Sequence, residues 1–212
     1  MPSRRAFLFS ALALSAAAGC SRKQKMQPLP AGSTVLALGD SLTFGTGASA
    51  ETSYPTVLAR LTGWEVVNGG VPGDTAGGAL GRLPALLQQH QPRLVIVSIG
   101  GNDFLRRVAP AETRANIRNI CEQAATSGAQ VLLVAIPEVS AFAAAARSLA
   151  DHALYRELAT EMKIALHERG WSDVLNDPAL RSDPIHANAR GYEAFAAGLA
   201  ARARELGLLA AP

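Results

Sequence analysis

The sequence has few cysteines and no long apolar run, and each of these two features excludes a class of protein. Cys20 and Cys121 are its only 2 cysteines among 212 residues, too few for a disulfide-rich scaffold. The stretch of small and apolar residues at 6–19 is shorter than the roughly 20 residues that a membrane-spanning helix needs. By contrast, 49% of the residues are hydrophobic, which argues against a disordered chain and suffices for one sizeable core.

Acidic residues are absent from the first thirty positions, and this absence explains the basic balance of the whole chain. The formal net charge is +3 and the sequence isoelectric point is about 9.2. Five of the 20 basic residues lie in residues 1–30, so residues 31–212 hold fifteen basic residues against 17 acidic ones, a net charge of −2. Because nucleic-acid-binding domains carry clustered positive charge, we expect no nucleic-acid partner.

Residues 1–19 have the organisation of a signal peptide. Arg4 and Arg5 precede the uncharged stretch 6–19, which ends in small residues. Residues 3–8, Ser-Arg-Arg-Ala-Phe-Leu, resemble a twin-arginine export signal. The sequence therefore predicts an exported bacterial protein, located in the periplasm or on the cell envelope.

Residues 17–20, Ala-Ala-Gly-Cys, resemble the lipobox of bacterial lipoproteins. This resemblance implies that Cys20 is acylated and anchors the mature chain to a membrane; a plain cleaved signal is the alternative. Residues 21–30, which are polar, basic and end in prolines, are predicted to be a tether between the membrane and the domain. We therefore divide the chain into a signal peptide at 1–19, a tether at 20–30 and a single domain at 31–212.

From Ser33 onward, short apolar runs alternate with longer helical patterns. The strand patterns lie at residues 34–38, 65–68, 94–99 and 130–136, with a weaker one near 171–175. The helical patterns lie at 54–62, 76–89, 112–127, 147–169 and 188–206. Apolar strands without alternation are typical of a parallel sheet covered on both faces, so the predicted fold is a single-domain, three-layer α/β/α sandwich.

Polar and glycine-rich segments follow three of these strands, where the ligands of such sheets gather. They are Gly39-Asp40-Ser41-Leu42, Asn68 to Asp74, and Gly100-Gly101-Asn102-Asp103. A fourth segment, Asp183-Pro184-Ile185-His186, precedes the last helix.

These segments contain the parts of a nucleophilic hydrolase. Ser41 is the candidate nucleophile, His186 the candidate base, and Asp183 the group that orients and stabilises the imidazole. The backbone N–H groups of Ser41 and Gly73, with the side-chain amide of Asn102, are candidate donors of an oxyanion hole.

In this order, the four segments resemble the blocks of the SGNH (GDSL) hydrolase superfamily, closest to its bacterial thioesterase I, lysophospholipase L1 and arylesterase group. The resemblance covers roughly residues 33–206. It implies a flavodoxin-like parallel five-stranded sheet, a Ser-Asp-His hydrolase of esters and thioesters, and no metal or organic cofactor. The predicted protein is thus a serine esterase that acts on a small-molecule or lipid ester through an acyl-enzyme on Ser41.

Other residues near these blocks have structural explanations. Asp40, Asp74 and Asp103 suit turns or helix caps, and Cys121 falls on the apolar face of a helical pattern, which predicts a buried thiol. His90, His152 and His167 are expected to be solvated or near helix ends. Phe104 and Leu105 have two equal interpretations, an acyl pocket or plain packing.

A non-catalytic surface-binding lipoprotein on the same fold and a carbohydrate O-acetyl esterase stay open as alternatives. A metallophosphoesterase is disfavoured because the sequence has no Asp-x-His motif. The sequence leaves the acyl group and the oligomeric state open.

Overall fold

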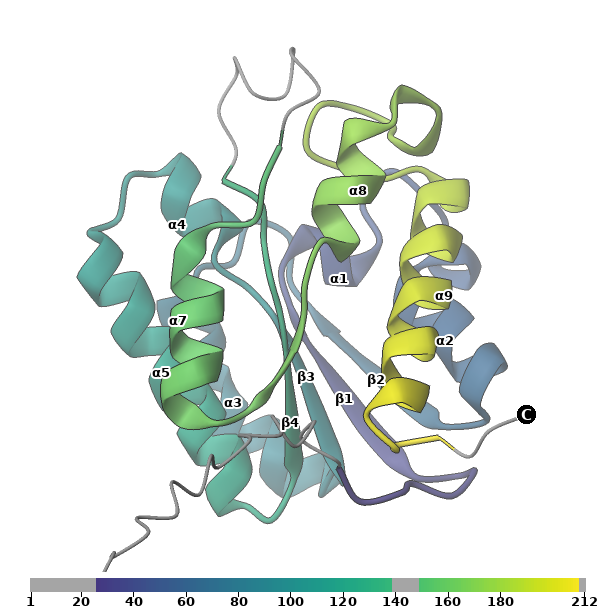
Figure 1. Cartoon of the computed structure of the whole chain (residues 1–212), viewed down its shortest axis with the longest axis vertical. Helices are drawn as coiled ribbons and strands as arrows, with labels where there is room; N and C mark the ends of the chain where they lie inside the picture. Colours follow the sequence, from purple (N-terminus) through teal and green to yellow (C-terminus); the bar gives the residue numbers. More distant parts are fainter. Residues whose placement is uncertain (1–25, 139–148, 210–212) are drawn as a thin grey trace, which may run out of the picture.

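The computed structural model describes residues 26–138 and 149–209 (Figure 1). Five parallel strands form one sheet in the order β2-β1-β3-β4-β5. The strands are β1 (Thr34–Gly39), β2 (Glu65–Gly70), β3 (Leu94–Ser98), β4 (Gln130–Val134) and β5 (Ala165–His167). The predicted α/β sandwich with a five-stranded parallel sheet is confirmed.

Helices cover both faces of the sheet. The described helices are α1 (Ser41–Phe44), α2 (Tyr54–Thr62), α3 (Ala76–His90), α4 (Gly101–Leu105), α5 (Pro110–Thr126), α7 (Ala153–Met162), α8 (Gly170–Asn176) and α9 (Ala189–Glu205), with the short 3-10 helices η1 (Ala50–Thr52) and η2 (Pro178–Leu180). In Figure 1, α3, α5 and α7 lie on one side of the sheet, and α2, α8 and α9 on the other. No helix among the described residues has the length and apolar character of a membrane span.

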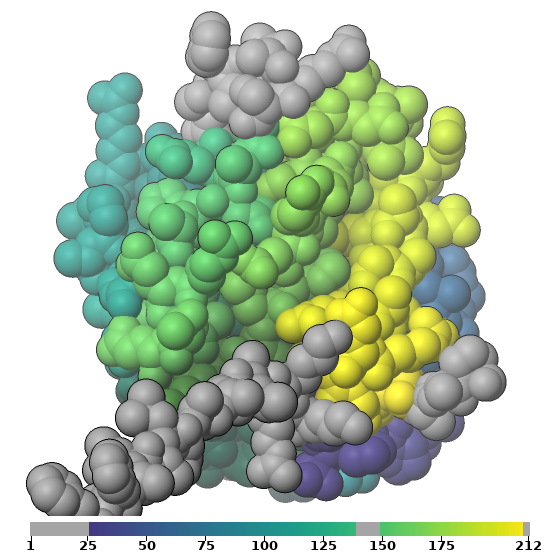
Figure 2. Space-filling view, viewed as in Figure 1, coloured from purple at the N-terminus to yellow at the C-terminus, as the bar shows by residue number. Residues whose placement is uncertain are grey.

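An aromatic cluster fills the core between the sheet and α9. Trp171 stacks on Phe195 with ring centroids 3.6 Å apart, and Tyr54 meets both rings edge-on. The indole N–H of Trp171 donates to Ser98 Oγ at 3.1 Å, which satisfies the polar end of the ring. Residues 149–209, coloured green to yellow, cover most of the face seen in Figure 2.

Two elements near residue 170 differ from their predictions. The predicted strand near 171–175 is wrong, because these residues form part of α8. Trp171, Val174 and Leu175 are spaced as one helix face and are all buried, a pattern that a short window does not separate from a strand. The predicted helix 147–169 is too long: Lys163 adopts a left-handed conformation with φ 53°, α7 ends before it, and β5 follows.

The predictions for the other elements agree with the structure to within about two residues. Cys121 is buried as expected, and burial raises the pKa of its thiol to about 12. Part of the predicted tether lies against the domain: the N–H groups of Met26 and Leu29 donate to the carbonyls of Leu206 and Leu208. The predicted signal peptide and Cys20 lie outside the described residues.

We expect Trp171→Ala to lower the free energy of unfolding by about 3–5 kcal/mol, because it removes a fully buried ring and leaves a cavity. Equilibrium unfolding in urea measures this loss. Trp171→Phe keeps a ring and loses the hydrogen bond to Ser98, so its loss should be smaller. A change below about 1 kcal/mol for Trp171→Ala would contradict the assigned role.

Candidate active site

Ser41 is the first residue of α1 and is separated from the end of β1 by Asp40 alone. Asp40 caps this helix, and its carboxylate accepts the N–H of Leu42 at 3.0 Å. The turn packs closely on β2, since a Cβ at Gly70 would overlap the backbone nitrogen of Phe44. This tight turn leaves Ser41 half-buried at the carboxyl edge of the sheet.

Ser41, His186 and Asp183 form one row of hydrogen-bonding groups. Ser41 Oγ lies 3.0 Å from His186 Nε2, and His186 Nδ1 lies 2.7 Å from Asp183 Oδ2. The histidine side chain is 16% exposed and the aspartate side chain 46%, so the imidazole is the more shielded partner. The structure thus brings together the three residues that the sequence proposes as nucleophile, base and orienting acid.

Hydrogen bonds within the loop bring the side chains of Asp183 and His186, three positions apart, into contact. Asp183 Oδ1 accepts the backbone N–H groups of Ile185 and His186, both at 2.9 Å. These two bonds curl the chain around the carboxylate and leave Oδ2 to meet the imidazole. The N–H of Ser182 also donates to the carbonyl of His186 at 2.9 Å, which closes the loop.

Asn188 attaches this loop to the start of α9. Its side-chain oxygen accepts the N–H of Gly191 at 3.1 Å, and its amide nitrogen donates to the carbonyl of Ala179 at 3.0 Å. Its own backbone N–H donates to the carbonyl of Leu180. Several hydrogen bonds therefore hold the loop that carries His186 in one conformation.

The charge of Asp183 decides the proton arrangement of the imidazole. Partial burial pushes the pKa of Asp183 upward, but hydrogen bonds from His186 and Ile185 outweigh burial, so the pKa lies below its usual value. An ionised carboxylate accepts a proton-bearing Nδ1, which leaves Nε2 free to accept the proton of Ser41. The row can therefore activate a serine for attack on a carbonyl carbon.

Two of the candidate oxyanion donors are backbone groups. Gly73 lies in the loop after β2 with φ +78°, a conformation that favours glycine. Among the described residues, neither the N–H of Gly73 nor that of Ser41 donates to a backbone or side-chain acceptor. Both N–H groups are therefore available to an anion.

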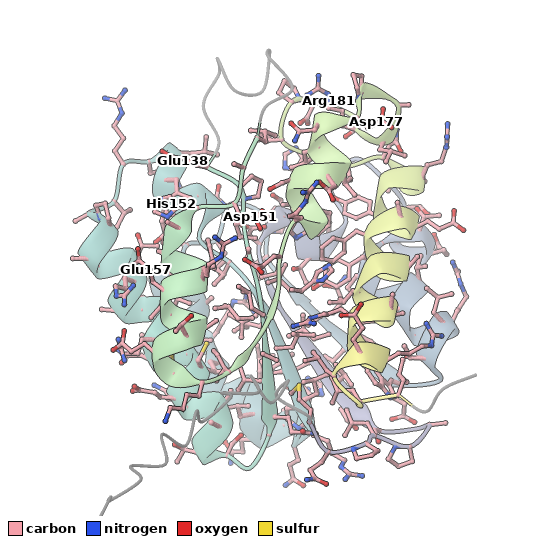
Figure 3. The ribbon with its side chains drawn as sticks, in the orientation of Figure 1. Glu138, Asp151, His152, Glu157, Asp177 and Arg181 are labelled. Atoms are coloured by element: carbon pink, nitrogen blue, oxygen red, sulfur yellow. The ribbon has the colours of Figure 1, made fainter. Side chains whose placement is uncertain are left out.

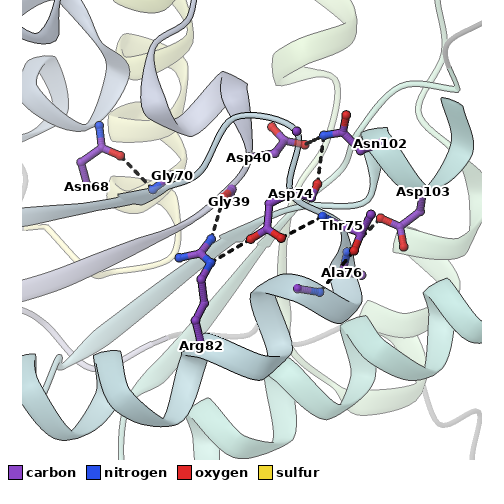
Figure 4. A network of polar contacts seen from close by, with 12 residues as sticks. Gly39, Asp40, Asn68, Gly70, Asp74, Thr75, Ala76, Arg82, Asn102 and Asp103 are labelled. Atoms are coloured by element: carbon purple, nitrogen blue, oxygen red, sulfur yellow. Dashed lines mark hydrogen bonds and ion pairs between the residues drawn. The ribbon is translucent and has the colours of Figure 1, made fainter. Parts of the chain in front are cut away.

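The third candidate donor, Asn102, is already partly engaged. Its amide nitrogen donates to the carbonyl of Asp74 at 2.9 Å and lies 3.4 Å from Asp40 Oδ2 (Figure 4). One N–H is thus held firmly and fixes the plane of the amide. The other has only the longer contact, and it is the one that a bound oxyanion would receive.

The three aspartates near the site act as caps and links. Asp40 is buried, and burial raises its pKa to about 6 against the lowering effect of the Leu42 N–H. Asp103 is buried and accepts the N–H of Ala76, the first residue of α3, at 2.8 Å. Asp74 accepts the N–H of Thr75 and pairs with Arg82, an arginine whose contact with the site no motif in the sequence indicates.

Phe104 and Leu105 differ in their surroundings. Phe104 stacks on His152 with ring centroids 4.4 Å apart and meets Tyr155 edge-on, while Leu105 is 47% exposed. Figure 3 places His152 at the start of α7 beside Glu138 and Asp151. Packing therefore accounts for Phe104, whereas Leu105 presents apolar surface near Asn102.

The remaining histidines lie away from the hydrogen-bonded row. His90 ends α3 and His152 caps α7. The expectation for His167 is wrong, because it lies buried in β5, where burial lowers its pKa to about 4. Within residues 26–138 and 149–209, no group of three or more His, Cys, Asp or Glu side chains is arranged to hold a metal ion.

Comparisons with known proteins agree on one family. The profile described as "GDSL-like Lipase/Acylhydrolase family" matches residues 37–194. The chain is 38% identical over 163 residues to "Thioesterase 1/protease 1/lysophospholipase L1" of Escherichia coli K12, covering 74% of this chain and 77% of that protein. It is also 37% identical over 123 residues to "Esterase TesA" of Pseudomonas aeruginosa, covering 56% and 61% respectively.

Solved structures show the same fold. The crystal structure of TesA superposes with a TM-score of 0.71 at 28% identity, covering 82% of this chain and 99% of that one. A psychrotrophic esterase, EstA from Pseudoalteromonas, gives a TM-score of 0.71 at 22% identity over 81% and 97%, a likeness of fold alone.

We expect Asp183→Asn to lower kcat for an activated ester by about 10³ to 10⁴-fold, because an amide that donates to Nδ1 favours the wrong tautomer of His186. Hydrolysis of p-nitrophenyl acetate measures it. Asp177→Asn is the matched control, since Asp177 caps η2 in the same region without touching the imidazole. Retention of more than about a tenth of wild-type kcat by Asp183→Asn would contradict the role.

Proposed function

The chain belongs to the GDSL-like lipase/acylhydrolase family, and on that premise we propose that it hydrolyses carboxylic esters through an acyl-enzyme on Ser41. The protein is a serine esterase by family. The observation that supports the residue assignment is the unbroken row from Ser41 Oγ through His186 to Asp183. Each member has the partner that its role requires.

Acylation begins when Ser41 Oγ attacks the ester carbonyl carbon and its proton passes to His186 Nε2. The carbonyl oxygen becomes an oxyanion that accepts the N–H groups of Ser41 and Gly73 and the amide of Asn102. The tetrahedral intermediate then collapses: the bond to the leaving oxygen breaks, and that oxygen takes the proton from His186. An alcohol leaves, and the acyl group stays on Ser41.

Deacylation repeats these steps with water in place of the serine. His186 Nε2 takes a proton from water, the hydroxide attacks the acyl carbon, and the same donors receive the second oxyanion. Ser41 Oγ leaves and regains its proton from His186, and the carboxylic acid is released. Asp183 stays ionised throughout and stabilises the imidazolium.

The substrate of this site carries an apolar acyl group. Among the described residues, the exposed large hydrophobic side chains are Phe44, Leu61, Val71 and Leu105. Three of these four lie within three positions of a candidate site residue: Phe44 follows Ser41, Val71 precedes Gly73, and Leu105 follows Asn102. Apolar side chains left in water around a polar site favour a ligand that covers them.

The two alternative functions have less support. The relatives described above are named as an esterase and a thioesterase, and these names favour neither a non-catalytic binding lipoprotein nor a carbohydrate O-acetyl esterase. Thioesters and lysophospholipids remain within the proposed class, because both present an acyl carbonyl to the same nucleophile.

We also propose that the protein is exported and anchored by acylation of Cys20. The support is the sequence alone: Arg4 and Arg5, the uncharged stretch 6–19, and the small residues before Cys20. Acyl chains on one residue would hold the domain at a membrane without a spanning helix.

The first prediction from this proposal concerns acyl length. Phe44→Ser should lower kcat/KM for p-nitrophenyl octanoate about 10-fold more than for p-nitrophenyl acetate, because only the longer chain covers this side chain. Leu61→Ser is the matched control: Leu61 is 44% exposed, against 53% for Phe44, but lies at the end of α2. Equal losses on both esters would argue against the acyl surface.

The second prediction concerns the anchor. In the source bacterium or a bacterial host, the mature protein should fractionate with membranes, and its mass should equal the chain from Cys20 plus acyl groups. Cys20→Ser should move the protein to the soluble fraction and leave ester hydrolysis intact. A mature chain that begins at Cys20 without added mass would refute lipidation.

A further inference from the structure

Arg82 of α3 joins the end of β1 to the loop after β2 through a partly buried fork of hydrogen bonds (Figure 4). Its Nε donates to Asp74 Oδ2 and a terminal nitrogen donates to the carbonyl of Gly39, both at 2.8 Å. The arginine side chain is 25% exposed and the aspartate side chain 12%. A planar guanidinium with two fixed donors holds both partners in one orientation.

Both ends of this fork lie beside the oxyanion donors. Gly39 is the last residue of β1, two positions before Ser41, and its carbonyl also accepts the N–H of Val71. Asp74 directly follows Gly73, and its own carbonyl accepts the amide of Asn102 at 2.9 Å. One guanidinium therefore links the backbone segments that carry the Ser41 and Gly73 N–H groups with the acceptor that orients Asn102.

We propose that the Asp74–Arg82 ion pair is a positioning pair that aligns the oxyanion hole of this enzyme. The inference rests on the proposed ester hydrolysis. Three donors on three separate loops serve one oxygen atom only if their relative positions are held to within about half an ångström. Arg82 lies on α3, a long helix outside the site, and holds the two segments at fixed positions relative to that helix. It contacts no reacting atom and acts through Asp74 and Gly39.

A positioning role and a purely structural role have different kinetic signatures. Misaligned oxyanion donors weaken binding of the transition state more than binding of the substrate, so kcat falls while KM changes little. Loss of folded protein lowers the amount of active enzyme but leaves kcat per folded molecule unchanged.

The test compares Arg82→Met with Arg202→Met. Arg202 is the matched control because it is similarly exposed, at 32%, and its guanidinium also bridges a carbonyl, that of Leu166, and a carboxylate, that of Glu205. For p-nitrophenyl butyrate, Arg82→Met should lower kcat per folded molecule about 10 to 100-fold with KM within about twofold. Arg202→Met should leave kcat unchanged, and Arg82→Lys should recover part of the loss.

A double substitution tests the route through Asn102. If Arg82 acts by orienting that amide, Arg82→Met should cost less than about threefold in the Asn102→Ala background. Full kcat in Arg82→Met overturns the proposal, and an undiminished effect in the Asn102→Ala background overturns the route through Asn102. Asp74→Asn, which keeps the side-chain size but removes the charge, allows the same measurement of kcat if Arg82→Met does not fold.

Failure of the proposed function would be distinguishable: ester hydrolysis by the wild-type protein would be absent, or it would survive Ser41→Ala.

Discussion

The pairing of β1 with β2 on one side and β3 on the other is the constraint on which the site depends. In this register Gly39 lies opposite both Gly70 and Ser98, so three strands end at one level. Ser41, Gly73 and Asn102 follow these three residues by two, three and four positions. Because parallel strands place all their carboxyl ends at one edge, hydrogen bonds between strands bring the nucleophile and the candidate oxyanion donors together before any side chain contributes.

The base reaches this edge by a different route. His186 is 145 positions from Ser41 along the chain, and no strand carries it there. Its loop lies between η2 and α9, and α9 packs on α2 and against the Trp171 cluster. The 3.0 Å contact between imidazole and hydroxyl therefore depends on helix packing. Hydrogen bonds between the strands therefore position the nucleophile and the oxyanion donors, whereas packing of aromatic side chains positions the base.

The sequence predicted the features that depend on neighbouring residues. Strands β1, β3 and β4 are apolar runs, and Asp183 and His186 are joined by hydrogen bonds within a four-residue segment, so both features leave a local pattern in the sequence. It missed the features set by distant contacts. The acceptors of Arg82, in Asp74 and Gly39, are eight and 43 residues away along the chain. A single arginine in a helical pattern does not predict such distant contacts. Trp171 has strand-like neighbours, but its place beside Phe195 is set by packing.

The acidic residues around the oxyanion donors give Arg82 an electrostatic role in addition to its positioning role. Asp40, Asp74 and Asp103 all lie near these donors, and the Asp74 charge adds to burial in raising the pKa of both other carboxyls. Uncompensated carboxylates would oppose the negative charge that forms on the ester oxygen. Burial raises the pKa of Asp40 to about 6, and the Arg82 guanidinium, 2.8 Å from Asp74, offsets the charge of that carboxylate. The same arginine therefore fixes the geometry of the donors and removes a charge that would weaken them.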